Sequence, residues 1–161
     1  MDPGVRFSEL LAYNEEETGR WQRFFEAHPA ALDAPCDVAH TGSVRKLVLH
    51  VFMTELYFAN LLTGAPNGGL DQLPFGTLDE LFAVHAEAHR KLQDFLGKAE
   101  QERWEEILPL GFRDLKASRR KMFAQAMLHG VNHRAQLATV LRQQGFQQDW
   151  VHDLILSSSM Q

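Results

Sequence analysis

The sequence predicts an all-α protein, a four-helix bundle with short additional helices, and three observations support this. Four segments of about 20 or more residues place apolar side chains at the spacing of one helical face. Stretches containing glycine and proline separate these segments. No segment of useful length alternates apolar and polar residues as a half-buried strand does. The connections differ in length, which indicates an antiparallel bundle with some links too long for simple hairpins.

The first two helices are predicted over residues 7–26 and 43–63. Apolar residues in the first helix can face a core: Leu10, Leu11, Trp21, Phe24 and Phe25. Its run of glutamates, residues 15–17, is interpreted as a solvated face, and the stretch HPAALDAP ends the helix. Ser43 has a suitable N-cap side chain at the start of the second helix, and the stretch GAPNGG ends that helix.

The third helix is predicted from the stretch TLDE to Phe95 or Leu96, because Thr77 and Glu80 have the spacing of a capping box. The following residues, 98–115, are expected to form at most a short helix that breaks at Pro109 and Gly111.

The fourth helix is predicted from about Ser118 to Gln144, ending at Gly145. A short helix is expected after it, through the stretch DWVHDLIL. The loop over residues 67–74 and the region around Pro109 are the expected long crossovers of the bundle.

The composition fits a single domain over residues 1–161 and excludes several classes of protein. With 45% hydrophobic and 23% charged residues, the chain is not expected to contain long disordered regions. Its formal charge of -5, without a lysine and arginine cluster, argues against a nucleic-acid partner. The single cysteine, Cys36, excludes an internal disulfide and a multi-thiolate zinc site. Without a secretory signal or a membrane-length apolar run, a cytoplasmic protein with no membrane partner is expected.

Two histidines, His129 and His133, lie four residues apart in the fourth predicted helix, so their imidazoles share one face. The same face carries a stripe expected to point toward the core: Met122, Gln125, Ala126, Gln136, Leu137 and Val140. Buried imidazoles are costly unless each has a partner, and a metal ion is one such partner. The spacing alone also fits surface histidines or core histidines with hydrogen bonds. Gly130 costs on the order of 1 kcal/mol in a helix, which suggests close approach by another helix or a ligand.

His50 lies at the border of an apolar stripe on the second predicted helix. Taken alone, it is interpreted as a core histidine bonded to a hydroxyl such as that of Tyr57. Combined with the pair on the fourth helix, it would complete three nitrogen ligands from two facing helices. A competing pair with the same spacing, His85 and His89, lies among charged residues and is interpreted as mostly exposed or bordering the core. The remaining histidines lie beside helix ends or loops, where capping or solvation is expected: His28, His40 and His152.

Two stretches of the chain resemble the DinB-like family, the DinB/YfiT-like metalloenzymes, and the resemblance spans nearly the full length. The stretch SVRKLVLHVFMTELYFANLLTG resembles the second helix of the family, in which a histidine follows a serine lead-in. The stretch LHGVNHRAQLATVLRQQG resembles the fourth-helix pattern H-G-T-x-H-R-G-Q. Five residues match this pattern: His129, Gly130, His133, Arg134 and Gln136. Val131 and Ala135 replace its threonine and second glycine, which affects the surroundings of the ligands rather than the ligands.

This resemblance implies an up-down-down-up four-helix bundle that is often a dimer. It also implies that His50, His129 and His133 bind a divalent metal ion, commonly zinc or nickel. The family pattern has no ligand on the third helix, which disfavours the competing histidine pair. For a homodimer, exposed apolar residues such as Trp104 or Trp150 could form the interface, although both could equally pack within the chain.

Three neutral nitrogen ligands leave a tetrahedral metal one position short, as in catalytic zinc sites. Such a metal lowers the pKa of a bound water to about 7 for hydrolysis, or binds a thiol as its thiolate. Relatives in the resembled family include S-transferases and isomerases that use low-molecular-weight bacterial thiols. The expected function is therefore a metal-dependent enzyme acting on a small molecule, either a thiol transferase or a hydrolase. The alternatives are a non-catalytic metal-stabilised module for binding or stress response, and a bundle without metal.

No general base follows from the sequence. Glu55 lies five residues after His50, which is about 140° around the helix, and Tyr57 is nearer to the predicted metal face. Arg134 is expected to hold an anionic group or to pair with a carboxylate. Gln136 is expected to orient a ligand or a water.

Overall fold

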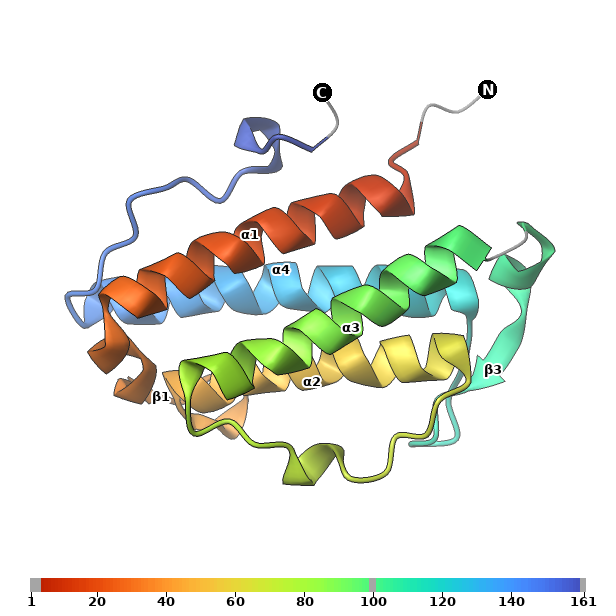
Figure 1. Cartoon of the computed structure of the whole chain (residues 1–161), viewed down its shortest axis with the longest axis horizontal. Coiled ribbons are helices and arrows are strands. Elements are labelled where there is room, and N and C mark those ends of the chain that lie inside the picture. The colour runs from red at the N-terminus through yellow and green to blue at the C-terminus, as the bar shows by residue number, and fades with distance from the viewer. Residues whose placement is uncertain (1–3, 99–100, 160–161) are drawn as a thin grey trace.

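The computed structural model describes residues 4–98 and 101–159. Four long helices form the bundle: α1 (Phe7–Ala27), α2 (Val44–Thr63), α3 (Leu78–Lys98) and α4 (Arg119–Gln143). In Figure 1, α1 and α4 run in one direction and α2 and α3 run in the other. The predicted all-α fold with up-down-down-up topology is confirmed.

Short elements occupy the links between the long helices and the segment after α4. In the described part of the chain, five are short 3-10 helices: η1 (Pro29–Asp33), η2 (Val38–His40), η3 (Leu70–Gln72), η4 (Gln101–Glu105) and η5 (Leu154–Leu156). Two small antiparallel ribbons pair β1 (Pro35–Cys36) with β2 (Gly42–Ser43), and β3 (Ile107–Pro109) with β4 (Lys116–Ser118). The sequence did not predict these ribbons, because strands of two or three residues are too short to show alternation.

The predicted caps set the starts of three helices. The Ser43 hydroxyl accepts a hydrogen bond from the Lys46 amide at 3.4 Å, which caps α2. Thr77 and Glu80 exchange the two hydrogen bonds of a capping box before α3, at 3.0 and 3.1 Å. Ser118 caps α4 in the same way as Ser43 caps α2. The third helix continues through Gly97 to Lys98, two or three residues beyond the predicted end at Phe95 or Leu96.

The link between α2 and α3 runs back along the bundle, so these two helices are parallel (Figure 1). The loop over residues 67–74 is therefore a crossover, as predicted. The link between α3 and α4 stays at one end of the bundle, where Figure 1 shows β3. The crossover predicted around Pro109 is wrong, because this region forms an end-on hairpin between antiparallel helices.

The C-terminal segment, residues 146–159, returns along α1 instead of forming the predicted helix (Figure 1). Its helical content is the single turn η5. Trp150 packs edge-on against Trp21 at 5.1 Å, and Ser158 donates to the Glu16 carboxylate. Trp104 also packs within the chain, against aromatic rings that include Phe7.

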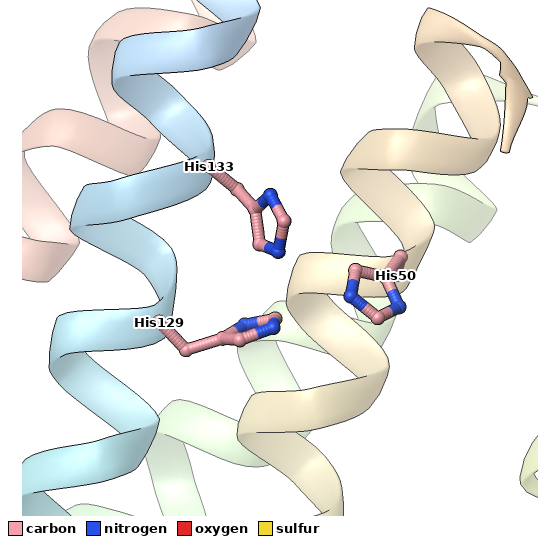
Figure 2. Close-up of side chains that lie close together, drawn as sticks. All are labelled: His50, His129 and His133. Atoms are coloured by element: carbon pink, nitrogen blue, oxygen red, sulfur yellow. The ribbon is translucent and has the colours of Figure 1, made fainter. Parts of the chain in front are cut away.

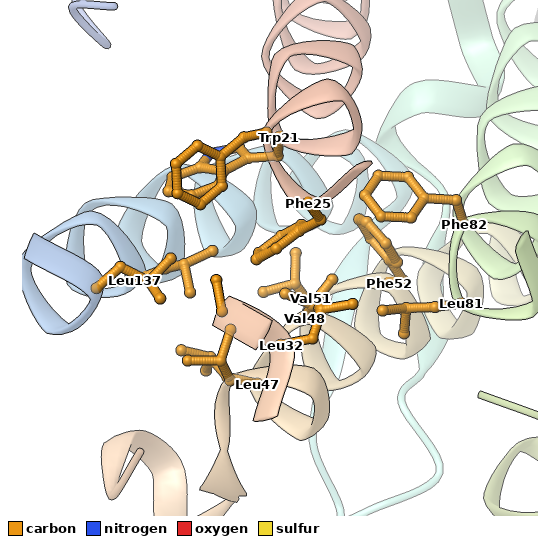
Figure 3. Packing of buried hydrophobic residues seen from close by; sticks show 14 of the residues in the cluster. Trp21, Phe25, Leu32, Leu47, Val48, Val51, Phe52, Leu81, Phe82 and Leu137 are labelled. Atoms are coloured by element: carbon orange, nitrogen blue, oxygen red, sulfur yellow. The ribbon is translucent and has the colours of Figure 1, made fainter. Parts of the chain in front are cut away.

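The apolar core has two parts. One contains large residues from all four helices and η1, including Trp21, Phe25, Phe52 and Leu137 (Figure 3). The buried thiol of Cys36 belongs to it. The other part gathers around the following residues: Leu11, Phe58, Leu92, Phe95, Met122 and Phe123.

All four long helices contribute buried polar residues to one set that crosses the bundle. We call this set the buried polar layer: Asn14, Glu17, Glu55, His85 and Arg134. The interpretation of residues 15–17 as a solvated face is therefore wrong for Glu17, which is 1% exposed. Conversely, Gln125 and Gln136, expected in the core-facing stripe of α4, are exposed.

Candidate metal centre

Three imidazoles from two helices converge on one point (Figure 2). His129 and His133 project from α4 toward His50 on α2, and the three ligand nitrogens lie within 4.8 Å of one another. The ring centroids are 4.4 to 5.1 Å apart. His50 and His129 are partly exposed, whereas His133 is 9% exposed, so the cluster has one side open to solvent. We call these residues the three-histidine cluster.

Gln136 fixes the orientation of the His133 ring. The Oε1 atom of Gln136 lies 2.7 Å from Nδ1 of His133. An amide oxygen accepts hydrogen bonds and does not donate them, so His133 Nδ1 carries the proton and Nε2 keeps its lone pair. Gln136 therefore orients a ligand, one of the two roles that the sequence suggested.

The cluster favours neutral imidazoles. Burial, followed by the neighbouring His133, lowers the pKa of His50. Burial, His133 and His50 lower the pKa of His129 to about 4, against a smaller opposing effect of Glu55. Near neutral pH these rings hold the lone pairs that a metal ligand needs.

The donor set fits a divalent metal ion. The Nδ1 atom of His129 is buried and has no hydrogen-bond partner among residues 4–98 and 101–159. A buried polar atom without a partner is uncommon and calls for an explanation such as an ion. Three imidazole nitrogens suit zinc or nickel.

The hydroxyl partner expected for His50 is not Tyr57. The Tyr57 hydroxyl donates to the carbonyl of Leu110. Glu55 does not face the cluster as a base either, because its two oxygens contact Asn14 at 3.1 Å and His85 at 2.8 Å.

Gly130 leaves space for two side chains of the buried polar layer, Glu55 and Arg134. A Cβ atom at this position would lie 3.2 Å from Oε1 of Glu55 and 3.3 Å from both terminal nitrogens of Arg134. The expected close approach therefore comes from these two charged side chains. Arg134 is 7% exposed, and its terminal nitrogens have no hydrogen-bond partner in the described part of the chain. Burial lowers the pKa of Arg134, with Glu55 and Glu17 acting in the opposite direction.

In the competing histidine pair, His89 is partly exposed at the border of the core, as predicted, whereas His85 occupies a different place. His85 is 4% exposed, so its interpretation as mostly exposed or bordering the core is wrong. Its two ring nitrogens contact two carboxylates, Glu55 and Glu15. The sequence missed Glu15 because a run of glutamates gives no sign that one of them faces another helix.

The loop histidines differ among themselves. His28 lies at the end of α1, where its Nδ1 is 3.0 Å from the Phe24 carbonyl, and His40 is exposed. His152 does more than the predicted capping or solvation, because it hydrogen-bonds to buried Glu17 at 2.7 Å and stacks on Trp21.

The sequence model of the DinB family matches residues 2–158. The chain belongs to the DinB family. This match includes all three residues of the three-histidine cluster, and the up-down-down-up bundle agrees with the fold that the resemblance to DinB proteins implied. Searches of curated proteins and of solved structures found no match. Within its described residues, this DinB protein has no helix long and apolar enough to cross a membrane.

Proposed function

We propose that this DinB-family protein is a metal-dependent enzyme whose divalent ion is held by His50, His129 and His133. The observation that carries the proposal is the convergence of three imidazole nitrogens within 4.8 Å on a partly exposed side of the bundle. Three protein ligands leave a tetrahedral ion one position for another molecule. Zinc or nickel is the proposed ion.

A divalent ion held there supplies positive charge that lowers the pKa of a thiol or a water beside it. The contacts around the cluster favour a thiol. Within residues 4–98 and 101–159, Nδ1 of His133 donates its hydrogen bond to the amide oxygen of Gln136, and none of the three imidazoles bonds to a carboxylate. Hydrolysis needs a base to accept the proton of water, whereas a thiol is already acidic, with a pKa of about 8.5.

We therefore propose transfer of a low-molecular-weight thiol to an electrophilic small molecule. The thiolate sulfur forms a bond to an electrophilic carbon, and the bond between that carbon and its leaving group breaks. His50, His129 and His133 hold the ion, and Gln136 keeps His133 in the ligating tautomer. The homodimer implied by the family resemblance stays a prediction, which analytical ultracentrifugation tests.

The metal is tested first, by elemental analysis of protein purified without chelator. We expect His133→Ala to lose the ion at this cluster and His40→Asn, a change of an exposed histidine with left-handed backbone, to keep it. No bound metal in the unmodified protein, or equal metal in it and in His133→Ala, would contradict the proposal.

The reaction is tested on metal-loaded protein. We expect conjugation of small bacterial thiols to a chromogenic electrophile, and its loss in His50→Ala. Ester or amide hydrolysis lost in the same variant would assign a hydrolase instead. A fall in Tm on chelation without either activity would assign the non-catalytic module.

A further inference from the structure

A second group of possible metal ligands lies between α1 and α3. It consists of Glu15, His85 and His89, whose ligand atoms all lie within 4.8 Å of one another. Nε2 of His85 is 2.7 Å from Oε2 of Glu15, and Nδ1 of His89 is 3.2 Å from the same oxygen. The two histidines are one turn apart on α3, so both face the glutamate across the helix pair.

Glu55 holds the His85 ring in place from the opposite side. Its Oε2 lies 2.8 Å from Nδ1 of His85, and Glu55 is completely buried. A carboxylate bonded to the far nitrogen of an imidazole is the arrangement that orients ligating histidines in metal sites. The inner wall of the group is thus fixed without an ion, with Nε2 of His85 directed toward Glu15.

His89 contributes a nitrogen whose bonding is incomplete. Its Nδ1 atom is buried and makes no hydrogen bond within the described ranges, although the Glu15 oxygen lies 3.2 Å away. The pair is close but misaligned for a hydrogen bond. An ion between the two atoms would satisfy both of them.

An ion can reach this group from solvent. An open groove of about 590 Å³ is lined by Glu15 and His89, with Ser8, Gln93 and Ser158 around them. The Glu15 side chain is 52% exposed, whereas that of His85 is 5% exposed. The group therefore has a buried ligand at its base and two ligands at the groove.

We propose that Glu15, His85 and His89 form a second binding site for a divalent transition-metal ion, separate from the three-histidine cluster. Two imidazoles and one carboxylate are a known zinc ligand set, with a further position left for a molecule in the groove. At zinc bond lengths of about 2.0 to 2.1 Å, neighbouring ligand atoms in a tetrahedron are about 3.4 Å apart. The Glu15 oxygen is closer than this to both nitrogens, at 2.7 and 3.2 Å, so the exposed carboxylate moves slightly outward when an ion binds, and the proton between Glu15 and His85 leaves to solvent.

Counting zinc ions in variants of the full chain tests the second site. After dialysis against excess Zn²⁺ and removal of free ion, we expect two ions per chain in the unmodified protein. We expect one ion in His89→Ala, one in His133→Ala and none in the double variant. Glu15→Gln, at an exposed position, is expected to lose the same ion as His89→Ala, and His40→Asn is the matched control with two ions. Circular dichroism confirms that each variant is folded.

The outcomes separate this inference from the proposed function. A single ion that His133→Ala removes and His89→Ala keeps would overturn the second site and leave the three-histidine cluster standing. A single ion that His89→Ala removes and His133→Ala keeps would overturn the three-histidine cluster and leave the second site standing. Cobalt loaded into His133→Ala gives a further readout, because a tetrahedral protein site absorbs visible light more strongly than octahedral aqueous cobalt. A spectrum identical to that of aqueous cobalt would overturn the second site.

Discussion

At the scale of single residues, Gly130 shows how a helix admits charged groups into its interface. A helical glycine costs about 1 kcal/mol relative to alanine, so the position gains something that a Cβ would remove. The gain is room for Glu55 and Arg134, which lie 3.2 and 3.3 Å from the place of the missing atom. Both neighbours are buried, so neither moves away freely.

We predict that Gly130→Ala destabilises the fold. Crowding buried groups costs about 1 to 3 kcal/mol, which outweighs the gain of about 1 kcal/mol in helix propensity. The expected net loss is about 1 kcal/mol in the free energy of unfolding, measured by urea denaturation. Gly19→Ala is the matched control, because its Cβ would meet only the flexible end of Arg23, at 3.5 Å. We expect the free energy of unfolding of this control to rise by up to about 1 kcal/mol. A rise of that size in Gly130→Ala would show that Glu55 and Arg134 shift to make room for the new methyl group.

Gln136 is a residue whose effect is expected on metal affinity rather than on the fold. It is exposed, and it accepts the hydrogen bond from Nδ1 of His133. We predict that Gln136→Ala weakens zinc binding at the three-histidine cluster by about 10 to 100-fold, as loss of such partners does elsewhere. Gln136→Glu keeps an acceptor and is expected to retain the affinity. Competition with a chromogenic chelator measures both, and equal affinity in Gln136→Ala and the unmodified protein would refute the role.

At the scale of elements, Glu55 on α2 contacts the other three long helices. From α2 it accepts a hydrogen bond from Asn14 on α1 and contacts His85 on α3. It also lies against α4 at Gly130. One carboxylate therefore fixes the register of the bundle at the buried polar layer.

We predict that Glu55→Gln lowers the free energy of unfolding by about 3 kcal/mol, because it removes the buried carboxylate beside His85 and Arg134 and leaves them only Glu15 and Glu17 as compensating charges. Urea denaturation measures the loss. Glu87 pairs with Arg90 on the exposed side of α3, so Glu87→Gln is the control. It is expected to change the free energy of unfolding by no more than about 1 kcal/mol. Similar losses in the two variants would mean that the buried carboxylate does not stabilise the bundle.

The same scale shows what the sequence could predict. Caps such as Ser43 and Ser118 act within one turn, so the helix starts follow from neighbouring residues. The pairing of His129 with His133 follows from helical spacing. In contrast, the ribbon of β3 and β4 and the path of residues 146–159 depend on contacts with distant residues, which spacing does not report.

The candidate metal site was likewise predictable only in part from the sequence. His50, His129 and His133 needed the resemblance to select them, and the structure brings them together. Whether they bind a metal stays a prediction. Glu15 and Glu17 looked like surface residues because their partners come from α3 and from the C-terminal segment.

At the scale of the whole molecule, Glu55 lies between the two histidine groups. The three-histidine cluster is built on α2 and α4, and the second group is built on α1 and α3. Glu55 contacts His85 directly and lies against Gly130, the neighbour of His129. The polar layer is thus continuous across the bundle, and the protonation of its members bears on the stability of the entire fold.

We predict that the metal-free protein is most stable near pH 6.5. Burial acts to lower the pKa of His85, but Glu55 and Glu15 raise it to about 9, above the ordinary histidine value of 6.5. From pH 6.5 to 9 the folded state thus holds a proton that the unfolded chain lacks, and rising pH favours unfolding. The pKa of His129 is about 4, so from pH 6.5 down to 4 the unfolded chain binds the extra proton, and falling pH favours unfolding.

Each such proton changes the free energy of unfolding by at most about 1.4 kcal/mol per pH unit. Urea midpoints of chelator-treated protein at several pH values on either side of the expected maximum measure the profile. His85→Gln is expected to remove the fall on the alkaline side, whereas His40→Asn is expected to keep it. If the folded protein holds the extra proton, the urea midpoint falls as the pH rises from 6.5 to 9. A midpoint that rises steadily over this range would therefore contradict the raised pKa of His85.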